Sequence, residues 1–259
     1  MREYTTLSKK KIKLIKSLEF RKFRKSSGLF LAEGPKLIGE LLPFFRCHLL
    51  VATKDWYKEN PTVKAEDYVL SSPEELSKAS LLKTPQNVLA LFYQPTYTVD
   101  LSKCTNKLSL VLDGVQDPGN LGTIIRLADW FGIEYLFCSP ETVDVYNPKT
   151  VQATMGALAR VKLSYTPLPK LIEDFTSLSI PIYGTFLSGK NIYEEELSQQ
   201  GVLIMGNEGQ GISKEIESKV THPLYIPNYP LNRESTESLN VGVATAVACA
   251  EFRRQALKK

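Results

Sequence analysis

A lone arginine, Arg126, stands in an otherwise apolar stretch that follows a polar, glycine-containing loop. A guanidinium group is permanently charged and carries forked N–H donors, so it can grip a phosphate or stabilise an oxygen that is gaining negative charge. On a helix wheel Arg126 leaves the apolar face, whose members are Leu121, Ile124, Ile125 and Ala128. The spacing therefore predicts an anion-handling side chain that points back toward the loop.

A predicted strand, turn and helix position Arg126. Apolar alternation indicates a strand at Leu108–Leu112, and Asp113-Gly114 ends it with residues that strands disfavour. The stretch Asp117–Asn120 then has the chemistry of a turn that leads into a helix. This order of elements would hold Arg126 beyond the carboxyl end of a strand.

Two further glycine-bearing loops follow predicted strands, at Gly206–Gly211 and Pro227–Asn240. In an open α/β sheet the loops beyond the carboxyl ends of the strands line the ligand crevice, although each loop alone could be no more than a tight connection. The glycines at 206, 209 and 211 do not make the GxGxxG dinucleotide fingerprint, and no GK[ST] phosphate loop occurs. A nucleotide-dependent α/β enzyme is therefore disfavoured.

Strands and helices alternate from Leu108 onward, which predicts a mostly parallel sheet covered on both faces. The strands expected there are 108–112, 135–138, 161–163, 182–186, 202–205 and 224–226, and the last helix is 239–255. The first hundred residues predict a smaller α/β unit with strands at 29–32, 48–52 and 87–92, a helix at 35–42 and a capped helix that begins at Ser72. A polar stretch without periodicity at 95–107 separates the two parts, so we expect domains at 1–100 and 107–259.

The segment Lys9–Lys25 holds nine basic residues and one acidic residue, Glu19. On one continuous helix the cations Lys9, Lys10, Lys13, Lys16, Arg21 and Arg24 would share a face, and Ile12, Leu14, Ile15, Leu18 and Phe23 would dock on the protein. The cationic face could be merely solvated, or it could bind the phosphates of a nucleic acid. A transit peptide is disfavoured because lysine dominates the segment and the N-terminal region contains the acidic residues Glu3 and Glu19.

The composition excludes several classes of protein. The longest apolar run near the end of the chain, Val241–Ala250, is short of the roughly 20 residues that a membrane helix needs. The cysteines at 47, 104, 138 and 249 lack metal-ligand spacing, which predicts core residues of a reduced, cytoplasmic protein. We therefore expect no membrane segment and no metal.

Taken together, the three loops resemble the motifs of a known family. Asn120 with Arg126, then GNEGQGIS, then IP followed by ESLNV, is similar to the ordered motif set of the SpoU (TrmH-like) RNA ribose 2′-O-methyltransferases of the SPOUT superfamily. Upstream, GLFLAEGPKLIGELL and LLKTPQNVLALFYQP resemble the ribosomal-protein-like substrate-binding domain that many members carry. The resemblance implies an α/β catalytic domain with a C-terminal trefoil knot, a homodimer, S-adenosylmethionine as methyl donor, and a structured RNA substrate, with 23S rRNA favoured over tRNA.

The resemblance also assigns residues to the site. It implies that Gly206, Ile226 and Leu239 bind the donor, and that Arg126, Asn120, Glu208, Ser238 and Asn240 form the catalytic site. The family's arginine is often assigned as a general base, but a guanidinium has a pKa above about 12 and no acceptor atom. We therefore expect Arg126 to grip phosphate and stabilise the developing alkoxide.

The roles of the other polar residues stay open. Asn120 could bind the nucleotide or hold the first loop in shape. Glu208 could pair with Arg126 or a substrate hydroxyl, or be an N-terminal carboxylate of the helix expected near Ile212. Ser238 is also a good helix N-cap.

The chain departs from the family pattern at two places. Gly242 replaces the serine of the usual SLNVS motif, and the loop PNYPLNRESTES is several residues longer than the usual form. A non-catalytic RNA-binding protein that has lost donor binding is therefore the alternative from another class. Because Arg126, Ser238 and Asn240 are all present, we expect an active enzyme.

Overall fold

The computed structural model describes residues 3–97, 100–230 and 238–257, and the chain forms two compact units. The first unit comprises residues 1–96 and 144–159, and the second comprises 97–143 and 160–259. The division after residue 96 lies within the stretch 95–107 where we expected a linker. Residues 144–159 pack with the first unit, although the sequence pattern placed them in the second domain.

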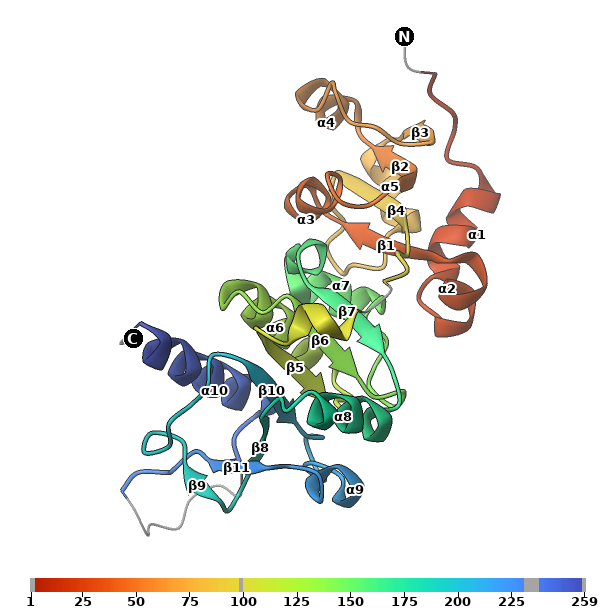
Figure 1. The fold of residues 1–259 in the computed structure, drawn as a ribbon. Coiled ribbons are helices and arrows are strands. Elements are labelled where there is room, and N and C mark those ends of the chain that lie inside the picture. Colours follow the sequence, from red (N-terminus) through yellow and green to blue (C-terminus); the bar gives the residue numbers. More distant parts are fainter. Residues whose placement is uncertain (1–2, 98–99, 231–237, 258–259) are drawn as a thin grey trace. The chain divides into compact units, whose positions relative to one another are not determined.

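A four-stranded sheet in the order β1-β4-β2-β3 forms the centre of the first unit (Figure 1). Its strands are β1 (Leu29–Glu33), β2 (Cys47–Ala52), β3 (Asp67–Leu70) and β4 (Val88–Tyr93). β4 runs antiparallel to β1 and β2, and β3 runs parallel to β2. The expected strands β1, β2 and β4 are confirmed, whereas β3 and the short helix α4 (Lys54–Glu59) were not predicted.

Helices cover both faces of this sheet. On one face, buried residues such as Leu31 and Val51 pack with residues of α1 (Lys9–Ser17) and α5 (Pro73–Ala79). The other face carries Phe30 and contacts α3 (Pro35–Leu41) and α7 (Pro148–Thr154), which in turn contact the 3-10 helix η2 (Ala157–Ala159). The ring of Tyr146 lies 4.9 Å from that of Phe30, so the segment 144–159 completes the core of the first unit.

The predicted cap of α5 is confirmed, because Ser72 and Glu75 form a reciprocal capping box.

The second unit is built on a seven-stranded sheet in the order β7-β6-β5-β10-β8-β11-β9, in which every neighbouring pair is parallel. Its strands are β5 (Leu108–Leu112), β6 (Tyr135–Cys138), β7 (Lys162–Tyr165), β8 (Ile182–Phe186), β9 (Lys190–Asn191), β10 (Gly201–Met205) and β11 (His222–Tyr225). The parallel sheet and its six expected strands are confirmed with small shifts at their ends, and only the two-residue β9 was missed.

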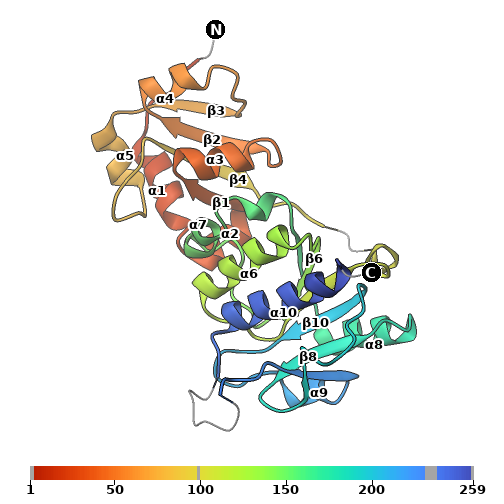
Figure 2. The ribbon, with the colours of Figure 1, turned by 90° about the vertical axis from the view of Figure 1, so that its left-hand side faces the viewer.

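Two layers of helices enclose the second sheet. α6 (Pro118–Trp130) and α10 (Val241–Ala256) lie side by side (Figure 2) and contact each other. On the opposite face α8 (Leu168–Ser177) and α9 (Lys214–Glu217) pack over buried strand residues such as Val111 and Ile204, with the 3-10 helix η1 (Leu101–Cys104) beside them. Burial on both faces explains why β5, β6 and β10 are nearly continuous apolar runs. All four cysteines are buried and unpaired, as expected of core residues.

Candidate active site

The three predicted loops lie beyond the carboxyl ends of parallel strands in the second unit. β10 pairs with β5 on one side, with Met205 beside Leu112, and with β8 on the other, and β11 lies beyond β8. Because parallel strands end at a common edge, the loops that follow β5, β10 and β11 emerge at the same edge of the sheet. The structure therefore brings the predicted catalytic and donor-binding loops to one side of the unit.

Glu208, in the second loop, holds the first loop in shape. Its carboxylate accepts hydrogen bonds from the backbone N–H groups of Gln116 and Asp117, each at 3.1 Å, and from Nδ2 of Asn120 at 2.9 Å. Asp117 in turn caps α6, because its Oδ1 accepts the N–H of Asn120 at 2.8 Å. Neither a pair with Arg126 nor a role at a helix near Ile212 is observed, since both carboxylate oxygens of Glu208 face the first loop.

The hydrogen bonds also keep Glu208 ionised. Burial acts to raise the pKa of this carboxyl group, but the donors from Asn120 and from the backbone outweigh it, and the pKa lies below its ordinary value. The negative charge stands beside the first residues of α6, where a helix favours an anion. Glu208 is therefore a fixed carboxylate that organises the loop before Arg126.

Asn240 connects the third loop to the first. Its Oδ1 accepts the N–H groups of Gly242 at 2.9 Å and Val243 at 3.3 Å, which caps α10. Its Nδ2 donates to Oδ1 of Asn120 at 3.0 Å. The expectation that Ser238 caps this helix is wrong, because α10 begins at Val241 and its N-cap is Asn240, while Ser238 is exposed. A chain of side-chain contacts from Glu208 through Asn120 to Asn240 thus joins all three loops.

The second loop is closed by Asn207, which the sequence analysis did not single out. The backbone of Asn207 exchanges two hydrogen bonds with Gly211, at 2.8 and 2.9 Å. Its Nδ2 donates to the carbonyl of Gly114 at 2.7 Å, and its Oδ1 accepts the N–H groups of Gly209 and Gln210. Asparagine two residues after a buried strand is the signal that could have identified this residue, because its short amide readily bonds to nearby backbone.

Gly206 sits where no side chain fits. A Cβ atom on this residue would lie 2.2 Å from the carbonyl carbon of Gly211 and 2.3 Å from the nitrogen of Ile212. These atoms are backbone and cannot turn aside as a side chain would. The chain therefore approaches itself closely at Gly206.

The residues expected to bind the donor lie at or near the carboxyl edge of the sheet. Gly206 directly follows β10, and the half-buried Ile226 directly follows β11. Leu239, 49% exposed, lies just before α10, and Leu187, 71% exposed, directly follows β8 between those strands. Exposed aliphatic side chains at the edge of the sheet suit a flat apolar ring that is bound by main-chain groups. The residues therefore fit an adenosine-containing donor.

Arg126 is exposed on α6, and no other residue described by the structure supplies a hydrogen-bond or ion-pair partner for its side chain. Other arginines of this unit are occupied: Arg160 forms an ion pair with Asp129 at 2.9 Å, and Arg253 donates to the carbonyl of Phe131 at 2.7 Å. The guanidinium of Arg126 is therefore available for an anion from outside the chain.

A cavity of about 470 Å³ lies in the second unit at the ends of β5 and β6, beside the second loop. Its lining includes the carboxylates of Asp113, Glu141 and Glu215, which would repel a phosphate. None of the residues expected to bind the donor lines it. The candidate site is therefore the edge formed by the three loops.

The basic segment of the first unit is two helices and not one. α1 ends at Ser17, and α2 (Arg21–Ser27) begins after Phe20. Lys9, Lys10, Lys13, Lys16 and Arg21 are exposed, as expected. Because α2 starts a new helical phase, two predictions are wrong: Phe23 faces solvent and is 40% exposed, and Arg24 is only 2% exposed.

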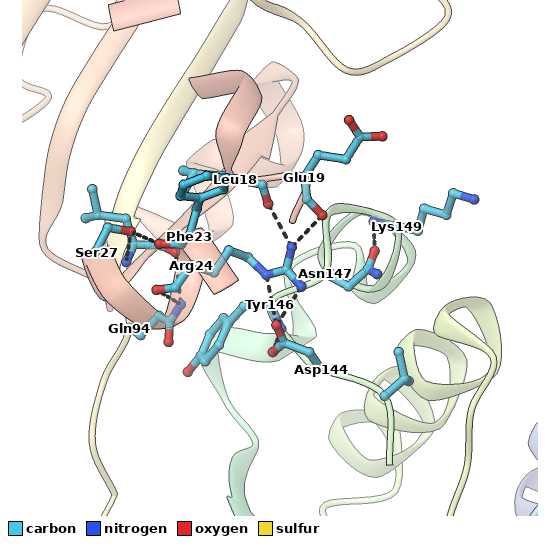
Figure 3. Close-up of polar contacts among 12 residues, drawn as sticks. Leu18, Glu19, Phe23, Arg24, Ser27, Gln94, Asp144, Tyr146, Asn147 and Lys149 are labelled. Atoms are coloured by element: carbon cyan, nitrogen blue, oxygen red, sulfur yellow. Dashed lines mark hydrogen bonds and ion pairs between the residues drawn. The ribbon is translucent and has the colours of Figure 1, made fainter. Parts of the chain in front are cut away.

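Arg24 is part of the core of the first unit (Figure 3). Its Nη1 donates to the carbonyl oxygens of Leu18 and Glu19, both at 2.8 Å, and its Nε donates to Oδ2 of Asp144 at 2.8 Å. Its Nη2 completes the ion pair with Asp144 at 2.7 Å. Arg24 is therefore unavailable to RNA, and it braces the corner between α1 and α2.

The described ranges hold neither a cluster of metal ligands nor a membrane-spanning helix. Across residues 3–97, 100–230 and 238–257, no three histidine, cysteine, aspartate or glutamate side chains gather as a metal site. Over the same ranges, no helix has the length and apolarity to cross a membrane. Residues 231–237 of the long third loop lie outside the described residues.

Comparison with known proteins identifies both halves of the chain. The SpoU rRNA Methylase family matches residues 107–250, and the MRM3-like substrate binding domain matches residues 9–90. The 23S rRNA (guanosine(2553)-2′-O)-methyltransferase RlmP of Bacillus subtilis is 31% identical over 98% of this chain and 100% of its own length.

Solved structures agree over nearly the whole chain. A TrmH-family protein from Porphyromonas gingivalis is 42% identical, with a TM-score of 0.87 over 97% of this chain and 100% of the other. The AdoMet-bound rRNA methyltransferase from Sinorhizobium meliloti is 29% identical, with a TM-score of 0.82 over 98% of this chain and 97% of the other. These matches place the three-loop site within a fold that also occurs with S-adenosylmethionine bound.

Proposed function

Because this chain belongs to the SpoU rRNA methylase family, we propose that it transfers a methyl group from S-adenosylmethionine to the 2′-hydroxyl of one ribose in 23S rRNA. The observation that carries the proposal is the hydrogen-bonded connection from Glu208 through Asn120 to Asn240. It fixes the start of α6, the helix that carries Arg126, whose side chain has no hydrogen-bond or ion-pair partner among the described residues. The relatives that act on 23S rRNA favour this substrate over tRNA.

The donor would bind at the carboxyl edge of the second sheet, held by the backbone at Gly206 and by the aliphatic side chains of Ile226 and Leu239. When bound, S-adenosylmethionine supplies an electrophilic methyl group on a sulfonium centre. The chain's own contribution there is an apolar slot with preformed main-chain donors and acceptors. Gly206 lets the backbone of Gly211 and Ile212 pack directly against it, and Asn207 holds the loop that follows closed.

Arg126 would act on the ribose and its neighbouring phosphate. The hydroxyl must lose its proton as its oxygen attacks, and negative charge then grows on that oxygen. A forked guanidinium can bind the phosphate and stabilise this oxygen together, while it keeps its own protons. We assign the proton to the substrate phosphate or to water, because a guanidinium has no acceptor atom.

Asn120, Glu208 and Asn240 would position the loop before Arg126. Their side-chain hydrogen bonds to one another fix the shape of that loop, and a fixed geometry at the reacting groups favours reaction. Ser238 is exposed just before the cap of α10, and its hydroxyl can donate to and accept from the ribose or the donor.

The first unit would hold the RNA. Exposed cations at Lys9, Lys10, Lys13, Lys16 and Arg21 supply attraction to phosphates that does not depend on sequence. The match of residues 9–90 to a substrate-binding domain supports this assignment. Domains 1–100 and 107–259 would then divide RNA binding from methyl transfer.

We also propose that the second unit is knotted at its C-terminal end and pairs with a second copy, in a cytoplasmic enzyme. Family membership supports the trefoil knot and the homodimer. The exposed side of α10 offers a place for the dimer contact, since Val243 on this helix is 51% exposed.

Mapping of 2′-O-methyl groups across all RNA, in cells with and without this gene, tests the function. One ribose in 23S rRNA is expected to lose its methyl group, and the purified protein with labelled S-adenosylmethionine should restore it. Loss of a methyl group from a tRNA would instead support the tRNA alternative. No lost methyl group, together with no donor binding by calorimetry, would support a non-catalytic RNA-binding protein.

A further inference from the structure

Two phenylalanines at the corner between α1 and α2 face solvent as a pair. Phe20 is 56% exposed and Phe23 is 40% exposed. Their rings meet edge to face, with centroids 6.4 Å apart and planes at 72°. Single exposed apolar residues are common on proteins, but two large rings in mutual contact form a continuous apolar surface.

Cations surround this pair. Arg21, Lys22 and Lys25 are exposed on α2, and Lys16 is exposed in the last turn of α1. The Nζ atom of Lys22 lies 4.8 Å from the centroid of the Phe23 ring. Glu19 is the single acidic residue between Lys9 and Lys25. A surface that combines flat rings with positive charge matches a ligand that combines flat rings with negative charge.

The corner that presents the rings is fixed from inside. Arg24 binds the carbonyl oxygens of Leu18 and Glu19, which immediately precede Phe20. Asp144 holds the guanidinium of Arg24 by an ion pair, in a setting where Arg24 is almost fully buried. The carbonyl of Phe23 accepts the hydroxyl of Ser27 at 2.7 Å, as Figure 3 shows. The rings are therefore displayed on rigid backbone, which lowers the entropy lost when a ligand binds.

From these observations we propose that Phe20 and Phe23 form a stacking site for an unpaired nucleobase of the RNA substrate, with Arg21, Lys22 and Lys25 on the flanking phosphates. The inference rests on the proposed function, and it adds that the substrate presents a single-stranded loop or bulge at the first unit. Proteins recognise RNA in this way because unpaired bases can leave their own stack and lie on aromatic side chains. A continuous duplex has no free base for these rings.

Binding of two RNAs by the full-length protein tests the proposal: a hairpin with an unpaired loop, and a fully paired duplex of the same length. The double variant Phe20→Ala/Phe23→Ala should bind the hairpin about tenfold more weakly than the wild type and the duplex equally well. Phe44→Ala is the matched control, because Phe44 is 59% exposed on the same unit and lies outside the corner.

The variant Phe20→Leu/Phe23→Leu separates stacking from general apolar contact. Leucine keeps the apolar surface but has no flat ring, so this variant should bind the hairpin as weakly as the alanine variant does. Wild-type affinity of either double variant for the hairpin would overturn the proposal. Binding to phosphatidylglycerol vesicles that needs the two rings, with unchanged hairpin affinity, would identify a lipid surface and would also overturn it.

The same variants distinguish failure of this site from failure of the proposed function. The rings do not belong to the three-loop site, so both double variants should methylate at the wild-type rate when RNA is saturating. Unchanged hairpin binding with intact methylation would reject the stacking site and leave the function standing. A wild-type protein that methylates no RNA would reject the function, while the hairpin comparison would still decide the stacking site.

Discussion

The side chain of Asn240 donates a hydrogen bond from Nδ2 to Oδ1 of Asn120, at 3.0 Å, although 120 positions separate the two residues in sequence. The other end of the same amide caps α10. Asn120 in turn donates a hydrogen bond from its Nδ2 to the carboxylate of Glu208. Asn240 therefore caps α10 and also binds Asn120 in the first loop. Through Asn120 it helps to fix the residues that precede Arg126.

Two substitutions at Asn240 should separate these roles. Asn240→Ala removes both contacts and should lower the free energy of unfolding by about 1 kcal/mol, as expected for a lost helix cap. Asn240→Asp keeps an oxygen for the N–H groups of Gly242 and Val243 but has no donor for Asn120, so it should keep stability and lose activity. Chemical denaturation and methyl transfer measured on the same samples check this. Full activity of Asn240→Asp would show that the link to Asn120 is dispensable.

Glu208→Gln should lower stability near neutral pH. The amide of glutamine places a donor where the structure needs an acceptor for Gln116, Asp117 or Asn120. Since folding lowers the pKa of Glu208, its ionised form stabilises the fold above the ordinary value of 4.5, and this contribution is lost as pH falls through the lower folded-state pKa.

Thermal unfolding of wild type and Glu208→Gln across this range measures the effect. The difference between their melting temperatures should be largest near pH 7 and should shrink below pH 4.5. Glu141→Gln is the control, because Glu141 is exposed and no hydrogen bond to another described residue involves its side chain. A difference that stays constant with pH would mean that the charge of Glu208 has no part in holding the loop.

Gly206→Ala should abolish donor binding and destabilise the fold. Its Cβ would overlap the backbone of Gly211 and Ile212, and overpacking against atoms that cannot move costs about 3 kcal/mol or more. Gly209→Ala is the matched control in the same loop, since its Cβ would meet nothing closer than Oδ1 of Asn207 at 3.7 Å. Calorimetry with S-adenosylmethionine and thermal unfolding should show the first variant impaired and the second unchanged. Normal donor binding by Gly206→Ala would exclude Gly206 from the donor site.

Val243→Arg should convert a dimer into monomers. The substitution places a charge on the exposed side of α10 and leaves the backbone N–H of Val243 free to bond with Asn240. Leu178→Arg is the control, because Leu178 is 45% exposed at the end of α8, away from that helix. Light scattering coupled to size-exclusion chromatography reports the mass. A wild-type monomer, or a Val243→Arg dimer, would contradict pairing through α10.

Local patterns predicted the elements that carry the site, but not the contacts between them. Buried parallel strands such as Leu108–Leu112 are recognisable because an apolar run between turn residues is their signature. The hydrogen bonds that join Glu208, Asn120 and Asn240 were not predictable, since they depend on how distant loops meet at the sheet edge.

The errors in the first unit have a different cause. The helix wheel of the basic segment assumed one unbroken helix, so the break after Ser17 reversed the positions of Phe23 and Arg24. Nothing near Arg24 in sequence indicates its partner Asp144, which is 120 positions away. The aromatic pair and its buried support therefore became visible only in three dimensions.

Arg126→Ala should lose activity without loss of stability. Because the Arg126 side chain contacts no other described residue through a hydrogen bond or ion pair, its removal should change the free energy of unfolding by less than about 0.5 kcal/mol. Loss of a group that stabilises a developing oxyanion lowers turnover by about 100-fold. Arg126→Lys tests the role directly: a lysine keeps the charge but lacks the fork, so turnover at saturating RNA and donor should stay low with an unchanged pH profile. Full activity of Arg126→Lys with a lower pH optimum would instead identify this residue as a general base.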